Sequence, residues 1–239
     1  MNEAPPFRAL GPWRWAVRER TLAVILPAPA DALGWAPLGG GFRRTRLIVN
    51  HQVALDDRVA TEAPARRLRR VIRALGLDPR GAVGMMTGAD LARVAVTSAR
   101  RDGLGVGAWC TAGCANALRV GDRATAGSDG VGTINLIVTI DRPLSRPAIV
   151  EASQIAVEAR TAAMLAAQIP SVRSRRLATG TGTDCVTVAA PRAIAGAPEP
   201  LVYCGMHTLA GELIGRAVFA AVTGALARAA RPPARFVAR

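Results

Sequence analysis

The sequence contains no lysine, so all 31 of its basic residues are arginines, against 17 acidic residues and a net charge of +14. Such a complete bias is as typical of base composition acting on codon choice as of selection for an anionic partner. The arginines are scattered along the chain, aromatic residues make up only 4% of it, and no nucleic-acid-binding motif occurs. These features do not match the charge footprint of a nucleic-acid-binding protein. We therefore predict no nucleic-acid partner.

Cysteine is scarce as well, with four residues in the chain: Cys110, Cys114, Cys185 and Cys204. The first two lie four positions apart, whereas a zinc knuckle has a spacing of three, and the other two form no second close pair. Reduced, mostly buried thiols of an intracellular protein fit this pattern. We expect no metal site and no cofactor.

Long hydrophobic runs and targeting signals are absent. Met1 to Pro6 is polar and proline-rich, without the basic start and apolar stretch of a signal peptide. The longest apolar run, Ala217 to Ala227, is well short of the ~20 residues that span a bilayer. We expect a soluble, cytoplasmic protein with no membrane partner.

No linker rich in serine, glycine or charge divides the 239 residues, and no internal repeat is present. We expect a single domain over residues 1–239, with loosely attached ends at residues 1–20 and 231–239. Half the residues are hydrophobic, mostly Ala, Val, Leu and Ile, which is enough for a sizeable core. The expected fold class is α/β (α+β), a single domain with a mixed or mostly antiparallel sheet and two long helices packed on one face.

Eight short apolar stretches predict β-strands. The strongest prediction is Thr133 to Ile140, which holds three Ile and one Val in eight residues. The Arg-Arg-Asp-Gly loop at 100–103 predicts an antiparallel hairpin between two of the strands. The other stretches are Thr21 to Leu26, Thr45 to Val53, Ala82 to Met86, Arg93 to Thr97, Val106 to Cys110, Val186 to Ala189 and Leu201 to Cys204.

Three helices are predicted. The first begins near Thr61, a good N-cap, with Pro64 in its first turn, and it ends at Gly76. The second runs from about Pro147 to Gln168 and carries a stripe of alanines that permits a close approach to a sheet. The third runs from about Thr208 to Arg228 and becomes apolar all round, which is typical of a helix that is buried on most sides.

Several segments are too polar and glycine-rich for ordinary core or surface. Gly180 and Gly182 allow a close backbone approach to a ligand, and the threonines around them could hold an oxygen-rich group, although a tight turn explains the same residues. His207 lies at a helix start, where the positive field favours a neutral imidazole. His51 and His207 are the only histidines; either could instead be a structural histidine.

The order of these segments resembles the adenosylcobinamide amidohydrolase family (CbiZ), from about Asn50 to Ala225. Glu158-Ala159-Arg160 falls at the family's Glu-Ala-Lys position, with Arg for Lys, and Cys114 departs from the smaller or hydroxyl residue expected there. The matching blocks are Asn50 to Val53, Thr111 to Gly113 with Asn116 and Ala117, Gly121-Asp122, Gly132 to Asn135, Ala178 to Asp184, and His207-Thr208 through Glu212 to Val218.

The resemblance implies hydrolysis of the amide between the corrin ring and aminopropanol of adenosylcobinamide, giving adenosylcobyric acid for coenzyme B12 salvage. The corrinoid is then the substrate and not a cofactor. The candidate catalytic residues are His51, Asn116, Asp184, His207 and Glu212. The candidate substrate-binding residues are Thr111, Asp122, Thr133, Asn135, Gly180, Thr181, Gly182, Thr183 and Thr208.

The nucleophile stays open among three routes. In the first, His207 or Asp184 activates water, and Asn116 or Asn135 with loop amides forms the oxyanion site. In the second, a Thr or Cys attacks directly and forms an acyl-enzyme. In a self-cleaving variant, Thr133 follows Gly132 at a strand start and becomes an N-terminal threonine.

Two other classes of function compete with the hydrolase. The alternative is a non-catalytic corrinoid-binding or delivery protein, and a basic nucleic-acid module is the third. Apart from the corrinoid, the buried last helix is suited to the interface of a homodimer.

Overall fold

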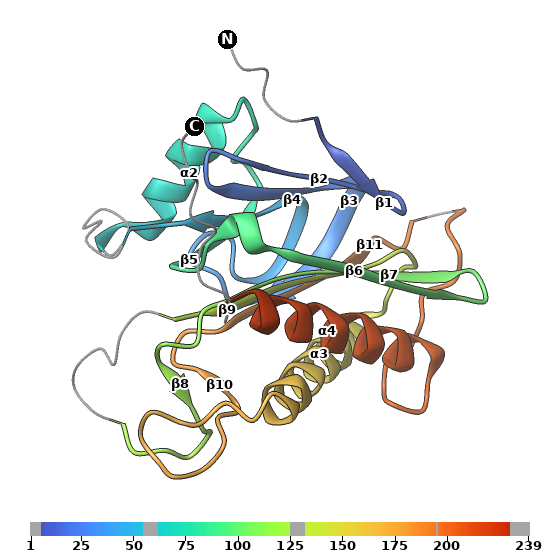
Figure 1. The fold of residues 1–239 in the computed structure, drawn as a ribbon. Helices are drawn as coiled ribbons and strands as arrows, with labels where there is room; N and C mark the ends of the chain where they lie inside the picture. Colours follow the sequence, from blue (N-terminus) through green and yellow to red (C-terminus); the bar gives the residue numbers. More distant parts are fainter. Residues whose placement is uncertain (1–5, 55–61, 125–131, 195, 230–239) are drawn as a thin grey trace, which may run out of the picture.

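The computed structural model describes residues 6–54, 62–124, 132–194 and 196–229. These residues form a nine-stranded mixed sheet, a separate two-stranded sheet and three α-helices (Figure 1). The elements are β1 (Arg8–Leu10), β2 (Trp13–Arg18), β3 (Thr21–Gly34), β4 (Gly41–Gln52), α2 (Pro64–Ala74), β5 (Val83–Thr87), a 3-10 turn (Leu91–Arg93), β6 (Ala95–Arg101), β7 (Leu104–Ala112), β8 (Ala117–Leu118), β9 (Ile134–Ile140), α3 (Arg146–Ala166), β10 (Gly180–Thr181), β11 (Cys185–Pro191) and α4 (Leu209–Ala229).

The large sheet folds over itself at β3. The first part of this long strand pairs with β2, and its second part pairs with β11, while β4 runs alongside both. The pairing with β4 shifts register between Ile25 and Ala30, where an irregularity lets the strand bend. We call β1–β5 the first half-sheet and β6, β7, β9 and β11 the second half-sheet.

Three hydrophobic clusters separate four layers. The first lies between α3 and α4 and the second half-sheet, and includes Leu136, Val138 and Ala152. The next lies between the two half-sheets and includes Trp109. The last lies between the first half-sheet and α2 and includes Leu68. Strand side chains alternate between these layers, so neighbouring residues of one strand face different clusters.

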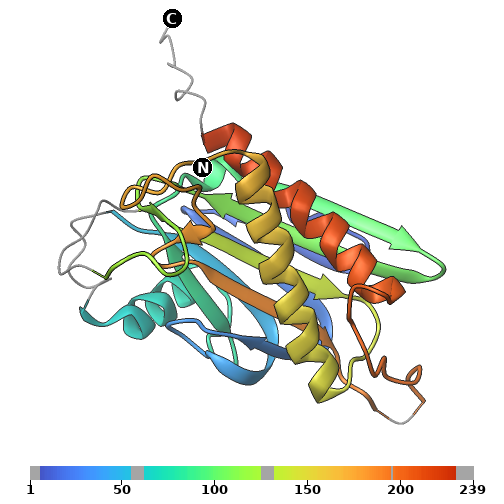
Figure 2. The ribbon, with the colours of Figure 1, turned by 90° about the horizontal axis from the view of Figure 1, so that it is seen from below.

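The predicted architecture is confirmed in its main features. Helices α3 and α4 lie side by side on one face of the sheet, as Figure 2 shows from below. The sheet is mixed, because β11–β9 and β4–β5 are parallel and the other pairs are antiparallel. The hairpin at 100–103 is also confirmed: Arg101 pairs with Leu104, and Asp102 and Gly103 turn with positive φ.

Two expectations were wrong in detail, and one feature of the fold was not anticipated. Leu201 to Cys204 is not a strand; within it only an isolated bridge joins Leu201 to Leu144. The N-cap of α2 is Ala63, which makes no side-chain cap bond, and the expected cap, Thr61, lies outside the described residues. The folding of the sheet into two layers, with α2 on the outer face of the first half-sheet, was not anticipated.

The expectation of a loosely attached N-terminus is wrong for residues 6–20. Strands β1 and β2 form a hairpin, and β2 pairs along its length with β3. Trp13 is 3% exposed and meets Trp109 edge-on, with ring centroids 6.1 Å apart. Burial of a tryptophan against another aromatic anchors this hairpin in the core. Residues 1–5 and 230–239 lie outside the described residues.

Helix α4 is long and apolar enough, by length and composition alone, to cross a membrane. Within the protein, 56% of its most apolar window is buried. Its buried side chains, such as Leu213, Ile214 and Val218, join the cluster under the helices. A helix buried in a protein core satisfies the same test of length and composition, and α4 packs extensively on the sheet.

Candidate functional site

Polar side chains collect at one end of the sheet, where β4, β5 and β7 end and β9 and β11 begin. We call this the polar end. The opposite end, where the β6–β7 hairpin turns and α4 begins, is called the hairpin end. Strand β7 joins them and is nine residues long, so they lie about 26 Å apart at the usual rise of a β-strand.

A buried amide network closes the core between the half-sheets at the polar end. Asn135 Nδ2 donates to Asn50 Oδ1 and to the Met86 carbonyl, both at 2.8 Å. Asn50 Nδ2 in turn donates to Thr111 Oγ at 3.0 Å. Asn50, Thr111 and Asn135 are each at most 2% exposed. Asn135 Oδ1 has no hydrogen-bond partner among the described residues. A buried acceptor without a partner marks a place where a donor can bind.

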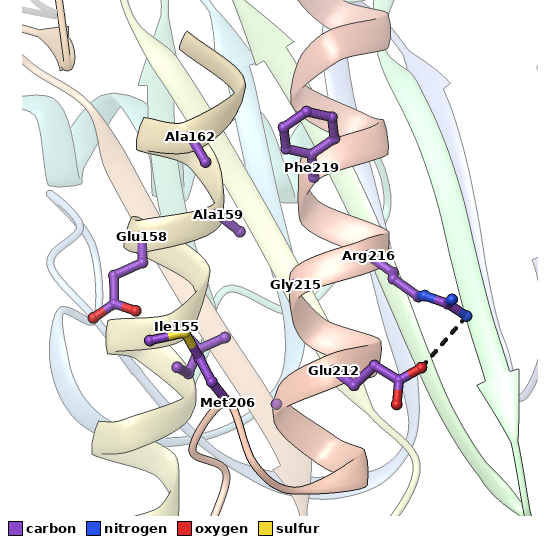
Figure 3. Close-up of a pocket in the computed structure, with 10 residues that line it drawn as sticks. Ile155, Glu158, Ala159, Ala162, Met206, Glu212, Gly215, Arg216 and Phe219 are labelled. Carbon is purple, nitrogen blue, oxygen red and sulfur yellow. Dashed lines mark ion pairs between the residues drawn. The ribbon is translucent and has the colours of Figure 1, made fainter. Parts of the chain in front are cut away.

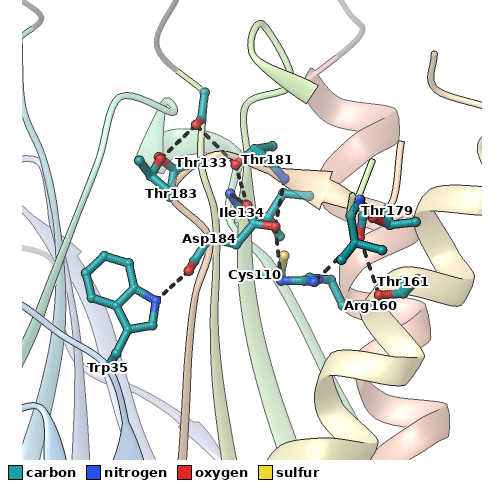
Figure 4. Close-up of polar contacts among 12 residues, drawn as sticks. Trp35, Cys110, Thr133, Ile134, Arg160, Thr161, Thr179, Thr181, Thr183 and Asp184 are labelled. Carbon is teal, nitrogen blue, oxygen red and sulfur yellow. Dashed lines mark hydrogen bonds and ion pairs between the residues drawn. The ribbon is translucent and has the colours of Figure 1, made fainter. Parts of the chain in front are cut away.

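Threonine hydroxyls surround the Gly132–Thr133 peptide at the start of β9 (Figure 4). Thr133 Oγ lies 2.8 Å from Thr183 Oγ. The Gly132 carbonyl oxygen lies 3.1 Å from Thr183 Oγ and 3.2 Å from Thr181 Oγ. Gly182 and Thr183 are exposed, so this group of hydroxyls is open to solvent on one side.

Asp184 fixes these threonines from the helix side of the sheet. Its carboxylate accepts from the backbone N–H of Ile134 and of Thr181, each at 2.9 Å, and also from Thr181 Oγ. Arg160 of α3 forms an ion pair with it at 3.0 Å. The Asp184 side chain is 6% exposed and that of Arg160 is 13% exposed. A buried carboxylate with this many donors holds β9, β10 and α3 in register.

Asn116 packs directly on Gly132. A Cβ on Gly132 would lie 2.5 Å from Asn116 Oδ1 and from the Gly113 carbonyl, so only glycine fits there. Asn116 is 9% exposed, and its Oδ1 has no hydrogen-bond partner among the described residues. Within the part of the chain that the structure describes, the polar end therefore holds two amide oxygens without a hydrogen-bond partner, on Asn116 and Asn135, beside one row of hydroxyls.

The thiols of the polar end, Cys110 and Cys114, are poor nucleophiles. Burial, together with the charge of Asp184, raises the pKa of Cys114 to about 11. The same two causes raise the pKa of Cys110 far above its usual range. Because the thiolate is the reactive species, the departure from the family pattern at Cys114 fits a packing role better than attack on an amide.

His51 does not face this cluster. It follows Asn50 on β4, so its side chain points to the other side of the strand. Its Nδ1 lies 2.9 Å from Thr21 Oγ, and the residue is 5% exposed. The expected role of His51 next to the other candidates is not supported by this placement, which suits a buried structural histidine.

His207, Thr208 and Glu212 lie at the hairpin end, across the sheet from Asp184. His207 is exposed in the loop before α4. Thr208 caps the helix, because its Oγ accepts from Gly211 N at 3.0 Å and donates to the Gly205 carbonyl at 2.8 Å. Glu212 pairs with Arg101 of β6 at 2.7 Å and with Arg216 at 3.4 Å. The expectation of a single site around the two histidines is therefore wrong, because His207, Thr208 and Glu212 lie at the opposite end of the sheet from the polar end.

The remaining candidates have local partners at the polar end. Asp122 accepts from Ser171 Oγ at 2.5 Å and from Arg119 N at 2.8 Å, and these bonds lower its pKa. Gly180 permits the close approach expected of it, but to a side chain: a Cβ there would lie 2.5 Å from Asp184 Oδ2. A Cβ at Gly182 would meet its nearest atoms, on Asn116 and Leu118, at 3.6 Å, an ordinary contact distance.

A hollow of considerable size lies elsewhere, between α3 and α4 (Figure 3). It has a volume of about 570 Å³ and an apolar lining that includes Ile155, Ala159, Met206 and Phe219. Its polar rim is formed by Glu158, Glu212 and Arg216. None of the hydroxyls or amides of the polar end lines it. Size alone therefore does not make this groove the reactive site.

Two members of the site were not among the candidate residues. Arg160 had a signal, because it occupies the basic position of the family's Glu-Ala-Lys block. Trp35, whose Nε1 donates to the Asp184 carbonyl at 2.7 Å, had none. Among the described residues, no cluster of three or more His, Cys, Asp or Glu side chains could hold a metal ion.

This chain is similar to several known proteins. The uncharacterized protein MJ1613 of Methanocaldococcus jannaschii is 28% identical over 207 residues, which cover 78% of each chain. The PH0078 protein of Pyrococcus horikoshii covers 90% of this chain and 79% of its own, at 12% identity and a TM-score of 0.44. The L-aminopeptidase D-Ala-esterase/amidase of Ochrobactrum anthropi covers 91% and 83%, at 12% identity and a TM-score of 0.39. The family model for adenosylcobinamide amidohydrolase matches residues 13–233, nearly the whole chain. This chain therefore belongs to the adenosylcobinamide amidohydrolase family of amide hydrolases.

Proposed function

We propose that this protein hydrolyses the amide bond between the corrin ring and aminopropanol of adenosylcobinamide. The products are aminopropanol and adenosylcobyric acid, from which a cell can rebuild coenzyme B12 with its own lower ligand. The observation that carries the proposal is the family match over residues 13–233. The corrinoid enters as substrate, and the reaction needs no cofactor in this scheme.

We propose the polar end as the place of reaction. A secondary amide offers one N–H donor and one carbonyl acceptor. The unpartnered Oδ1 of Asn116, beside Gly132, is suited to accept from the substrate N–H. The hydroxyl of Thr183 is suited to donate to its carbonyl oxygen as negative charge develops there. The exposed Gly182–Thr183 side gives the substrate access.

Asp184 is proposed as a positioning residue. Both of its carboxylate oxygens already accept bonds, from Ile134 N and Thr181 Oγ on one side and from Thr181 N and Arg160 on the other. A carboxylate so fully occupied has no lone pair directed at a water molecule, which disfavours it as a general base. Its effect on the reaction is then to hold the threonines and the start of β9.

The test is incubation with adenosylcobinamide, followed by mass spectrometry for aminopropanol and adenosylcobyric acid. We expect release by the wild-type chain, loss of release in Asp184→Asn, and unchanged release in His207→Ala and Glu212→Gln at the hairpin end. Corrinoid binding without release by the wild-type chain would contradict the proposal and indicate a delivery protein. Full activity of Asp184→Asn together with loss in His207→Ala would place the reaction at the hairpin end instead.

A further inference from the structure

The peptide bond between Gly132 and Thr133 is held in a way that suits its own cleavage. We propose that the protein cuts its chain at this bond, so that Thr133 becomes the N-terminal residue of a second fragment that stays within the fold. The cleavage is an activity of the chain on itself and needs no corrinoid.

The first observation is the environment of the Gly132 carbonyl. Its oxygen lies near two side-chain hydroxyls, Thr183 Oγ at 3.1 Å and Thr181 Oγ at 3.2 Å (Figure 4). Attack on a carbonyl moves negative charge onto this oxygen, and the Thr183 hydroxyl, a donor already in place, stabilises that charge. This peptide therefore has the oxyanion support that a cleavage reaction needs.

The second observation is the position of the nucleophile. Thr133 is 5% exposed, and its Oγ is held 2.8 Å from Thr183 Oγ. The Oγ of a threonine is joined to the preceding carbonyl carbon through its own Cβ, Cα and N, so attack closes a five-membered ring. An attack within one residue avoids the entropy loss of a bimolecular encounter.

The third observation is a path for the proton. Each hydroxyl has one hydrogen, and one arrangement satisfies every oxygen: Thr133 donates to Thr183, Thr183 donates to the Gly132 carbonyl, and Thr181 donates to Asp184. As Thr133 Oγ bonds to the Gly132 carbonyl carbon, its proton passes to Thr183 Oγ. The Thr183 proton passes to the carbonyl oxygen, which gives a neutral tetrahedral adduct.

The adduct then breaks at its C–N bond. The hydroxyl proton of the adduct goes to the Thr133 nitrogen, and an ester remains between the Gly132 carbonyl carbon and Thr133 Oγ. One water molecule hydrolyses this ester to a Gly132 carboxylate and a free Thr133 hydroxyl. The net change is addition of one water across the peptide bond, so no oxidant, reductant or other reactant is required.

Close packing keeps the bond in this geometry. The 2.5 Å gap that a Gly132 Cβ would leave to Asn116 Oδ1 and to the Gly113 carbonyl shows how tightly this residue is confined. The Gly113 N–H donates to the Thr133 carbonyl at 3.1 Å and fixes the next peptide, on the far side of Thr133. The unpartnered Asn116 Oδ1 can accept from the amine that cleavage releases.

A further consequence rests on the proposed function. A free α-amine in the same residue as the hydroxyl can take the proton of Oγ, which activates a threonine as a nucleophile toward an amide. The cleaved form would then attack adenosylcobinamide through Thr133.

The experiment is intact-mass spectrometry of the purified full chain. We expect two masses, for residues 1–132 and 133–239. Thr133→Val should remain a single chain, and Thr133→Ser, which keeps a hydroxyl, should be cut. Thr183→Val should slow cleavage because it removes the proton path. Thr139→Val is the matched control: Thr139 lies on the same face of β9, is wholly buried, and should leave cleavage intact.

Circular dichroism confirms that each variant is folded. A single full-length mass in the folded wild-type chain would overturn the inference, as would cleavage of Thr133→Val. If that uncut wild-type chain releases aminopropanol, the proposed function stands and self-cleavage falls. If the wild-type chain is cut but releases none, self-cleavage stands and the proposed function falls.

Discussion

The two ends of the sheet carry the same kinds of residue in very different settings. At the polar end, Asp184 and Arg160 form an ion pair with side chains 6% and 13% exposed. At the hairpin end, Glu212 is 31% exposed and pairs with Arg101 and Arg216, which are 48% and 70% exposed. Residue type alone therefore does not distinguish the two ends. Burial does, because the buried Asp184 carboxylate is held by many donors, whereas Glu212 is a solvated surface charge.

The largest expected difference between the two ends is in stability. Asp184→Asn removes the charge opposite Arg160 and leaves a buried guanidinium without its counter-ion, which typically costs ~3–5 kcal/mol. Glu212→Gln removes a solvent-screened pair, for which a change within about 1 kcal/mol is expected. Urea unfolding of both variants, followed by circular dichroism, measures the two costs. Equal losses of unfolding free energy would show that burial does not separate the ends.

The thiols give the next comparison, between Cys114 at the polar end and Cys204, whose backbone N–H is bound by Glu151 near the hairpin end. Burial first, then Asp184, raises the pKa of Cys114 from 9.0 to about 11, and burial with Glu151 raises the pKa of Cys204 to about 12. A rise of two units cuts the thiolate population at pH 8 by about 100-fold.

Alkylation by iodoacetamide tests this suppression. Cys114 should react about 100-fold more slowly than a free cysteine and Cys204 more slowly still, because the thiolate is the reacting form. The sign with pH follows from the raised values: the Cys114 rate should climb about tenfold per pH unit until pH approaches 11. Peptide mass spectrometry after timed quenching measures both rates. Labelling of Cys114 at the rate of an exposed thiol would speak against the burial that excludes it as a nucleophile.

The helices and central strands could be predicted from the sequence because their signals are local. The Ile and Val content of β9 and the alanine stripe of α3 are visible within the segments themselves. The hairpin β1–β2 also had a local signal, in the alternation of Trp13 and Trp15 with Arg14. The folding of the sheet into two layers had no local signal. It depends on an irregularity in β3 and on the hydrophobic cluster that the two half-sheets enclose, which brings together residues far apart in the chain.

The site divides along the same line. Thr181, Thr183 and Asp184 are close in sequence, and their grouping was predictable from that segment. The pairing of Asp184 with Arg160, from another part of the chain, was not predicted, because the family block indicated only a basic residue at position 160. His207 and Glu212 were misplaced because a polar helix start looks alike at either end of a sheet. His51 was misplaced because adjacent residues of a strand face opposite sides.

Two glycines provide the comparison with the smallest expected effects. A Cβ at Gly132, in the polar end, would meet Asn116 Oδ1 and the Gly113 carbonyl at 2.5 Å. Gly132→Ala forces these groups apart and should lower the free energy of unfolding by ~1–3 kcal/mol, as overpacking usually does.

A Cβ at Gly215, in α4, meets nothing within 4 Å. Gly215→Ala should therefore stabilise the protein by ~0.5–1 kcal/mol, because alanine loses less conformational freedom than glycine in a helix. Thermal unfolding at matched concentration separates the two, since the melting temperature should fall for the first variant and rise for the second. A rise for both would mean that Gly132 has room for a side chain, and that its peptide is not confined against Asn116 in the way that cleavage at Thr133 requires.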